Sequence, residues 1–454
     1  MTDTTERKYA IEGRKDAEAE RIAFNVDNMR ENKAYRYAAA AEGGDPGDEI
    51  LEAFQDRFRA YRKNWRGQPQ AAIERQLTGA AFAESGMYPL SVDIEIAAIC
   101  DLACPFCFRQ YIVTPDKIIS EDLYYRVIDQ CAEMGVPSIK LNWRGEPLLH
   151  PKIHEFIDYA KCNGVLEVMI NTNATTLDEK KARQLIEAGL DQIIYSFDGG
   201  SAASYEAMRV GRFKPNSFAD VYQNIRRFSE IRREMGAVYP RTKIQMILTE
   251  ATFDEQDQFF ELFEDCVDDV SVKAYTERGG SLPDLDEATR TRIEPQLAQH
   301  GVDHQASFWR DIHGDIFIST GRLPCEQPFQ RLMVTYDGRV SMCCYDWGSE
   351  HPIGYLDEMG FDDSEAYLKQ VVDAVAEGKA GFAEFMAEAR MPTQHIHPPK
   401  VVESLSEIWA GATVDAARKQ HVCGDIEEIE ICTQCPFKET YTWLDVNEGS
   451  QAAE

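Results

Sequence analysis

The chain has 454 residues, of which 44% are hydrophobic, and carries a net charge of −30 from 48 Lys and Arg against 78 Asp and Glu. This length and apolar content exclude a wholly disordered chain, and the acidic excess disfavours DNA or RNA as a partner. No apolar run approaches the ~18 residues that cross a bilayer, and the N-terminus lacks the apolar segment of a signal peptide. Without an export signal, its twelve cysteines indicate metal ligation rather than disulfides. We therefore expect a cytoplasmic protein that binds neither membranes nor nucleic acid.

Residues 1–90 are rich in Ala, Glu, Lys and Arg and are interrupted by the loop EGGDPGDE. This pattern predicts two or three helices, which we treat as an N-terminal helical extension. We find no recognisable chemistry in this segment.

From residue 91, short β-branched runs alternate with amphipathic helical segments, which is typical of a parallel sheet with crossover helices. The runs are 91–99, 138–143, 167–171, 192–197, 243–248 and 269–275. Six such repeats predict an α/β fold with a partial (β/α)6 TIM-like barrel over residues 91–310. Barrel enzymes place their sites at the carboxyl ends of the strands, and unusual polar residues follow these runs repeatedly.

Three cysteines, Cys100, Cys104 and Cys107, follow the first run with the spacing CxxxCxxC. A short loop with this spacing holds three corners of an iron-sulfur cluster and leaves the fourth iron open to a small molecule. A zinc knuckle or three unrelated buried thiols are the alternatives.

This run resembles the signature of the radical SAM superfamily, in which the open iron of a [4Fe-4S] cluster binds the amino and carboxylate groups of S-adenosylmethionine. The segment Arg144-Gly145-Glu146-Pro147 is similar to the family's Gly-Gly-Glu-Pro motif, with Arg144 in place of the first glycine. A glycine lets the backbone approach a ligand, and the adjoining carboxylate accepts bonds from an ammonium group. The cofactor-binding residues that the resemblance implies are Phe106, Gly145, Glu146, Asn171, Asn173, Ser196 and Arg209. For Arg209 the alternative is an exposed helix salt bridge.

Residues 311–454 contain a second set of cysteines. The pair Asp337-Gly338 lies between two alternating runs and predicts a tight hairpin, which cysteines bracket. The Cys-x12-Gly-x4-Cys spacing from Cys325 to Cys343 resembles the SPASM/twitch extensions of radical SAM enzymes, which implies one auxiliary [4Fe-4S] cluster in a domain of a β-hairpin plus helices. The four expected thiolates are Cys325, Cys343, Cys432 and Cys435. Cys344 is an alternative to Cys343, Cys423 is a candidate for an extra thiolate, and a structural zinc site is the main competitor.

The resemblance implies that an electron from a flavodoxin or ferredoxin cleaves S-adenosylmethionine to a 5′-deoxyadenosyl radical, which abstracts hydrogen from a substrate. Related extensions favour a small polyol, sugar or cyclitol, with oxidation, epimerisation or dehydration as the net reaction and an oxidoreductase as the class. Oxidation of a hydroxyl needs a base, and Asp346, three residues beyond Cys343, is our candidate, with a hairpin-edge aspartate as the alternative. Two other functions stay open. One is a peptide- or protein-modifying radical SAM enzyme of the sulfatase-maturase or peptide natural product type, and the other is a non-catalytic zinc or iron-sulfur interaction protein.

Overall fold

The computed structural model describes residues 10–11, 15–43, 48–110, 114–249, 251–274, 285, 287–302, 306–311, 315–347, 349, 351–361, 398–426, 429–433, 435, 437 and 440–447. The polar groups expected after the sixth strand, at 275–280, lie outside these residues. No helix among the described residues is long and apolar enough to cross a membrane.

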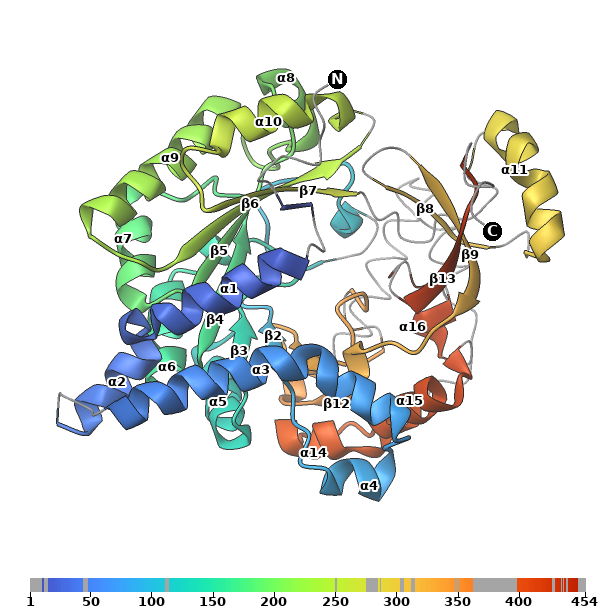
Figure 1. Ribbon diagram of the computed structural model, residues 1–454. Helices are drawn as coiled ribbons and strands as arrows, with labels where there is room; N and C mark the ends of the chain where they lie inside the picture. The colour runs from blue at the N-terminus through green and yellow to red at the C-terminus, as the bar shows by residue number, and fades with distance from the viewer. Residues whose placement is uncertain are drawn as a thin grey trace.

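Six parallel strands in sequential order form the centre of the molecule (Figure 1). They are β2 (Ser91–Ile94), β3 (Ser138–Lys140), β4 (Glu167–Thr172), β5 (Gln192–Ser196), β6 (Arg241–Leu248) and β7 (Asp269–Ala274). Each pairs in parallel with the next, from β2 through to β7. The two ends of this sheet do not pair with each other among the described strands, so the predicted partial (β/α)6 barrel is confirmed as an open sheet.

Helices join these strands and cover the outer face of the sheet. They are α5 (Glu121–Met134), α6 (Ile153–Cys162), α7 (Glu179–Ala188), α8 (Ala202–Met208), α9 (Phe218–Glu234) and α10 (Gln256–Phe263), with short 3-10 turns at Phe108–Gln110, Pro147–Leu149 and Phe253–Glu255. Local signals set their ends. The side chains of Ser120 and Asp178 accept the backbone N–H of the third helical residue, and Gly135 and Gly189 end α5 and α7 in the left-handed conformation.

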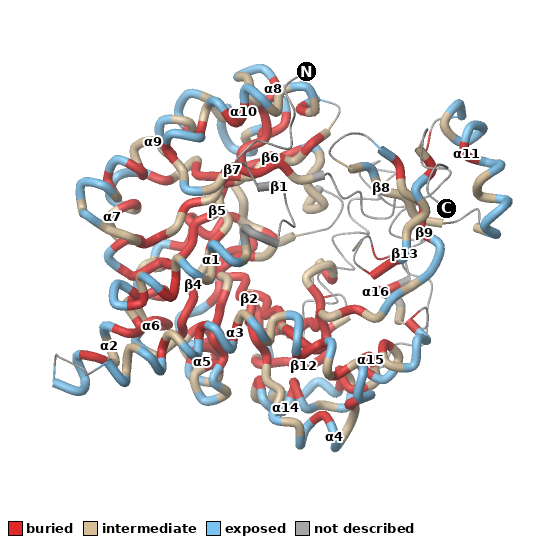
Figure 2. Tube along the Cα trace, in the orientation of Figure 1, coloured by how far each residue is buried: buried red, intermediate tan, exposed pale blue. Residues whose placement is uncertain are grey.

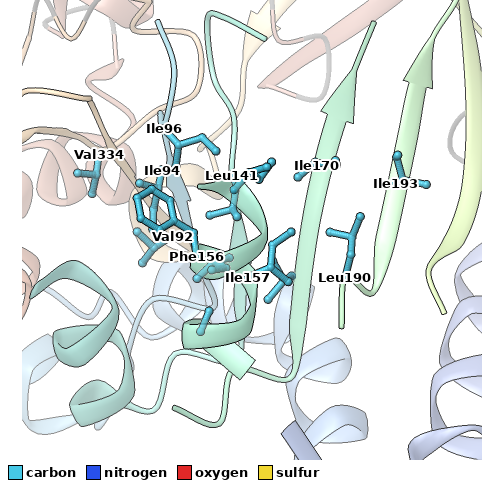
Figure 3. Packing of buried hydrophobic residues seen from close by; sticks show 14 of the residues in the cluster. Val92, Ile94, Ile96, Leu141, Phe156, Ile157, Ile170, Leu190, Ile193 and Val334 are labelled. Carbon is cyan, nitrogen blue, oxygen red and sulfur yellow. The ribbon is translucent and has the colours of Figure 1, made fainter. Parts of the chain in front are cut away.

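The two faces of the sheet differ in character. In β6, Thr242, Ile244, Met246 and Leu248 are buried while the residues between them are half-buried, because successive strand side chains point to opposite faces. The outer face is apolar and packs against the helices. Figure 3 shows Phe156 and Ile157 of α6 beside strand residues such as Ile170, and Figure 2 shows burial concentrated along the strands. The inner face is polar and is the candidate position for a functional site.

The N-terminal extension closes the amino end of the sheet. Its elements are β1 (Ala10–Ile11), α1 (Lys15–Asp27), a 3-10 turn (Met29–Glu31), α2 (Lys33–Ala41), α3 (Asp48–Glu74) and α4 (Gly79–Glu84). Asn32 donates to Asp191 Oδ1 at 2.8 Å, just before β5, and Tyr61 donates to Glu167, the first residue of β4, at 3.1 Å. The predicted helical extension is confirmed, with four helices among the described residues in place of the two or three expected. Strand β1, which pairs in parallel with β7, was not expected, because a two-residue strand has no sequence periodicity.

The C-terminal segment extends the same sheet at its other edge. Strand β10 (Arg331–Val334) pairs in parallel with β2, and β11 (Arg339–Ser341) and β12 (Gly354–Tyr355) follow in antiparallel order. The turn between β10 and β11 contains Gly338 at φ 87°, as a tight hairpin requires, so the predicted hairpin is confirmed.

A second, three-stranded sheet lies beside the first (Figure 1). It consists of β8 (Phe308–Arg310), β9 (Ile316–Arg322) and β13 (Tyr441–Asp445). The remaining helices are α11 (Glu287–His300), α14 (Leu405–Ala410), α15 (Ala412–Cys423) and α16 (Glu430–Thr433), with 3-10 turns at Gln327–Phe329 and Glu358–Phe361. Since β1 and β10 both join the central sheet, its pairing crosses the boundaries expected at residues 90 and 310, and that division into domains stays a prediction.

Candidate active site

The loop after β2 places the first three cysteines at the carboxyl end of the sheet. Cys104 is buried, and Cys100 and Cys107 are half-buried. The N–H of Cys107 donates to the carbonyl of Cys104 at 3.0 Å, which forms a turn between the second and third cysteines. Burial raises the pKa of Cys100 to about 12 and that of Cys104 to about 11. Thiolates this buried need a bound cation, and metal binding releases their protons.

Gly145 lies directly against this loop. A Cβ atom at position 145 would sit 2.2 Å from the carbonyl oxygen of Ala97 and 2.4 Å from that of Ile99. The N–H of Glu146 donates to the Ile99 carbonyl at 2.9 Å. Only glycine permits this approach, so position 145 fixes the start of the cysteine loop against the end of β3.

Glu146 fixes the end of β4. Its carboxylate accepts from Thr172 Oγ1 at 2.7 Å, from the N–H of Asn173 at 2.8 Å and from the N–H of Leu148 at 3.0 Å. Burial raises the pKa of Glu146 to about 7, while these hydrogen bonds lower it. Contact with a ligand ammonium group stays a prediction for Glu146. The bonds in the structure show it holding Asn173 toward the cysteine loop.

Asn173 connects the end of β4 to the cysteine loop. Its Nδ2 donates to Asp101 Oδ1 at 2.9 Å and lies 4.0 Å from Cys100 Sγ. Thr175 donates to the other oxygen of Asp101 at 2.5 Å. Asn173 thus lies beside the first cysteine set, as the sequence predicted. Its hydrogen bonds in the structure are to other protein groups.

Arg209 also reaches the first cysteine set. Its Nη1 lies 3.9 Å from Cys104 Sγ, its guanidinium lies over the ring of Phe106 at 5.4 Å, and its Nη2 pairs with Asp198 Oδ2 at 2.5 Å. Both Arg209 and Asp198 are buried. The exposed helix salt bridge that we considered for Arg209 is therefore wrong. Asp198, at the end of β5, is a partner that sequence reasoning did not assign.

Asn171 and Ser196 point to the inner face of the sheet. Both are half-buried, on β4 and β5. The backbone N–H of Asn171 donates to Asn142 Oδ1 at 2.8 Å, whereas its own Oδ1 is buried with no hydrogen-bond partner among the described residues. A buried carbonyl oxygen without a partner is a typical place for a ligand group to donate.

Arg144, the departure from the family motif, has a structural explanation. Its guanidinium binds Glu95 through two bonds of 2.6 Å, and the two side chains are 1% and 0% exposed. The neighbouring Trp143 donates Nε1–H to the carbonyl of Cys344 at 3.0 Å. The residues after β3 therefore hold the strand ends together and touch the C-terminal segment.

The second cysteine set is assembled from separate segments of the C-terminal region. Its members are Cys325, Cys343, Cys432 and Cys435, and all four are buried. Charge interactions of Cys343 with Cys325 and Cys435, and of Cys432 with Cys435, indicate that the four thiols lie in one neighbourhood. Cys423 is exposed at the end of α15, outside this set.

His421 of α15 belongs to the same neighbourhood and was missed by sequence reasoning. Its Nδ1 accepts the N–H of Cys325 at 3.2 Å, and its Nε2 lies 3.9 Å from Cys432 Sγ. Burial lowers the pKa of His421 to about 4, so the imidazole is neutral. A single histidine inside a helix gives no local signal that would have identified it.

Both sets show the hydrogen bonds that stabilise thiolates at a cluster. The sulfurs of Cys325, Cys343 and Cys435 each accept the N–H of the residue two positions on, at 3.4, 3.3 and 3.4 Å, and Cys100 accepts from the backbone of Leu102. Such bonds to sulfur tune iron-sulfur centres. Among the described residues, no three His, Cys, Asp or Glu side chains are spaced to hold a single metal ion. The donors of both sets are cysteine thiols, which are the ligands of iron-sulfur clusters.

Asp346 lies beside the second set. It is buried, accepts a short hydrogen bond from Ser341 Oγ, and accepts the N–H of His351 at 3.3 Å. Its negative charge contributes to the raised pKa of Cys432. The structure places Asp346 near the second cysteine set, as expected, and its role as a base stays a prediction.

Comparison with known families decides the class of protein. Residues 94–261 match the model of the radical SAM superfamily, and residues 325–364 match that of the SPASM iron-sulfur cluster-binding domain. The chain is a radical SAM enzyme with a C-terminal SPASM domain. This radical SAM enzyme accordingly uses S-adenosylmethionine and [4Fe-4S] clusters.

Among curated proteins, the radical SAM chain is 28% identical over 264 residues to a probable GTP 3′,8-cyclase of Methanopyrus kandleri, covering 56% of this chain and 80% of that protein. It is 26% identical to the GTP 3′,8-cyclase of Limosilactobacillus fermentum, covering 62% and 86%. It is also 24% identical to a tungsten-containing aldehyde ferredoxin oxidoreductase cofactor-modifying protein of Pyrococcus furiosus, covering 35% and 44%.

Among solved structures, BtrN in complex with AdoMet and 2-DOIA is 15% identical, with a TM-score of 0.40 and coverage of 78% of this chain and 96% of that one. Streptococcus suis SuiB bound to the precursor peptide SuiA is 15% identical, with a TM-score of 0.42 and coverage of 66% of each chain.

Proposed function

We propose that this radical SAM enzyme removes a hydrogen atom from a small hydroxylated molecule, a sugar, polyol or cyclitol, held on the inner face of the open barrel. Oxidation, epimerisation or dehydration of that molecule is the net reaction. The observation that supports this proposal is the polar character of the inner face at its carboxyl end. Asn171, Ser196 and Gln245 lie there on three adjacent strands. Amide and hydroxyl side chains of this kind bind hydroxyl groups by reciprocal hydrogen bonds.

We propose that the first cysteine set holds the cluster that binds S-adenosylmethionine. A cluster and S-adenosylmethionine held by Cys100, Cys104 and Cys107 would supply reductive radical chemistry for hydrogen abstraction. The protein positions this chemistry through Gly145, Asn173 and Arg209, whose contacts with the cysteine loop are given above. Arg209 is the only one of the three that carries a positive charge, so it is our candidate for the methionine carboxylate.

We propose that Cys325, Cys343, Cys432 and Cys435 hold one auxiliary cluster. Cys343 is favoured over Cys344 because its charge interacts with Cys325 and Cys435, whereas that of Cys344 interacts with Asp93, Lys140 and Arg331 of the inner face. Asp346 lies beside this set and is our candidate base for a substrate hydroxyl proton.

A nucleotide is the second candidate substrate. The chain covers 80% and 86% of the lengths of the two GTP 3′,8-cyclases described above, which act on a substrate with ribose hydroxyls. Nucleotides therefore belong among the hydroxylated molecules to be tested.

We propose that a flavodoxin or ferredoxin delivers the electron at the surface beside the first cysteine set. Val210 and Phe213 are 41% and 63% exposed there, and the carbonyl of Val210 accepts the N–H of Ala103 in the cysteine loop at 2.8 Å. Phe213→Ser is expected to slow reduction by the protein donor by about three- to tenfold, because exposed aromatic residues often anchor interfaces. Reduction by dithionite should not change, and Met359→Ser, which also removes an exposed apolar side chain, is the control. Equal slowing with both reductants would contradict a docking role.

All twelve cysteines are free thiols in the structure. This agrees with a reducing compartment, and we propose a cytoplasmic location.

The test of the proposed function is substrate-stimulated formation of 5′-deoxyadenosine. Reconstituted, anaerobic enzyme with S-adenosylmethionine and dithionite is incubated with sugars, cyclitols, nucleotides and short peptides in parallel. We expect stimulation by a sugar, cyclitol or nucleotide together with a change in that molecule. Stimulation by peptides alone would favour the peptide-modifying alternative, and clusters without any 5′-deoxyadenosine would contradict the proposal.

A further inference from the structure

The inner face of the barrel carries more positive than negative side chains. Residues paired across a parallel sheet share a face. The strand register therefore places six residues on the inner face: Arg331, Asp93, Lys140, Asn171, Gln245 and Lys273. In β10 and β2 to β7, the charged residues of this face are Lys140, Arg241, Lys243, Lys273 and Arg331 against Asp93, Glu167 and Asp269.

The carboxylates of this face have partners of their own. Arg21 of α1 binds Glu167 at 2.6 Å. Asp269 lies 3.6 Å from Lys243, and Asp93 lies 3.6 Å from Arg331. The Asp269–Lys243 and Asp93–Arg331 separations are both longer than an ordinary hydrogen bond.

Two cations of this face are left incompletely satisfied. The side chain of Lys140 makes no hydrogen bond or ion pair within the described residues. The Nε–H of Arg331 is buried without a hydrogen-bond partner there. Burial lowers the pKa of Lys140, Asp93 raises it, and the charges of Arg331 and Lys273 lower it further. Buried cations whose hydrogen-bonding groups lack partners are stabilised by a bound anion.

We infer that the substrate of the proposed reaction carries an anionic group, a phosphate or a carboxylate, and that Lys140 with Arg331 binds this group on the inner face. The inference rests on the proposed function, because it assigns the substrate class of the same site. Lys140 is on β3 and Arg331 is on β10, and these two strands lie on either side of β2.

The anion site lies on the inner face, toward the amino end of the sheet from Asn171, because Lys140 pairs with Met169. Lys140 and Arg331 are on the strands that flank β2, and the carbonyl of Cys344 accepts from Trp143, three residues beyond Lys140. The first cysteine set follows β2, the strand between them. The site is also unusual for a chain with a net charge of −30, whose overall field repels anions. Local cations are therefore required for an anionic substrate to bind.

The test is binding of pyrophosphate and of malonate, measured by equilibrium dialysis with the intact enzyme, clusters reconstituted and S-adenosylmethionine present, without reductant. Lys140→Gln is expected to weaken binding by about 10- to 100-fold, as loss of one charge-assisted hydrogen bond does. Lys140→Arg keeps the charge and should retain most of the affinity. Lys152→Gln is the matched control, because it removes the same charge from a side chain that is 40% exposed and pairs with Glu121.

Each outcome decides the inference. Saturable binding of either probe that falls in Lys140→Gln but not in Lys152→Gln supports it, and the better probe tells phosphate from carboxylate. Absence of saturable binding of both probes, or equal affinity in Lys140→Gln and the wild type, overturns it. Formation of 5′-deoxyadenosine with neutral sugars is scored separately. If anions fail to bind while neutral sugars stimulate, the inference fails and the proposed function stands, whereas anion binding without any cofactor cleavage contradicts the proposed function.

Discussion

The first cysteine set comes from one loop after β2, whereas the second gathers Cys325, Cys343 and the Cys432 to Cys435 pair from three separate segments. A few close contacts hold the first set, notably Gly145 against the loop backbone and Asn173 on Asp101. The second set forms only when the segment before Gln327–Phe329, the β10–β11 hairpin and α16 come together. The first site is therefore a local structure at the end of one strand of the sheet, whereas the second depends on the C-terminal fold.

The largest expected effect is at the first site. Cys104→Ala removes a ligand of the cluster that binds S-adenosylmethionine, so we expect no cofactor cleavage and a loss of about one cluster's worth of iron. The chain should remain folded by circular dichroism, because the contacts of the loop do not depend on this thiol. Cys423→Ala, at an exposed thiol, is the control. Normal turnover in Cys104→Ala would refute the assignment of this site.

The second site should be separable from the first. Cys343→Ala is expected to lose about one cluster's worth of iron and the net reaction while keeping uncoupled cleavage of S-adenosylmethionine, because the first cysteine set is built independently. Its neighbour provides the control, since Cys344→Ala should keep all of the iron. Equal iron loss in both variants would mean that the ligands of the second set are wrongly assigned.

The proton-transfer role of Asp346 is a smaller effect at the same site. Asp346→Asn keeps an oxygen that accepts from Ser341 and His351, so the fold and the iron content should be unchanged. If Asp346 is the base, oxidation of the substrate hydroxyl should fall by about 100-fold or more. An unchanged oxidation rate would leave it the hairpin-edge aspartate that we considered.

The smallest expected effect is on stability, at the ion pair between the strand ends. Arg144→Leu leaves Glu95 buried without its partner, which should cost about 3–5 kcal/mol. Arg126→Leu breaks a pair with Asp357 whose side chains are 49% and 24% exposed, and should cost about 1 kcal/mol or less. Urea denaturation with a probe in the barrel measures both. Equal shifts in the two variants would show that the buried pair contributes no more than an exposed one.

Features that are encoded over short distances could be predicted from the amino-acid sequence. The spacing of Cys100, Cys104 and Cys107 and the alternation in β6 needed no tertiary information, because a loop or a strand repeats its own geometry. The position of Asn173 after a strand was enough to predict that it lies near the cysteines, since parallel strands end at the same edge.

The partners of these residues could be identified only from the three-dimensional structure. Arg144 looked like a defect in a motif until Glu95, far away in sequence, was found to bind it. His421 had no local signal. Lys140 fits an alternating strand as an ordinary polar position, because the sequence pattern of a solvated face and that of a polar barrel interior are the same. Which of the two it occupies depends on the strands, helices and hairpin that enclose it, and these come from both ends of the chain.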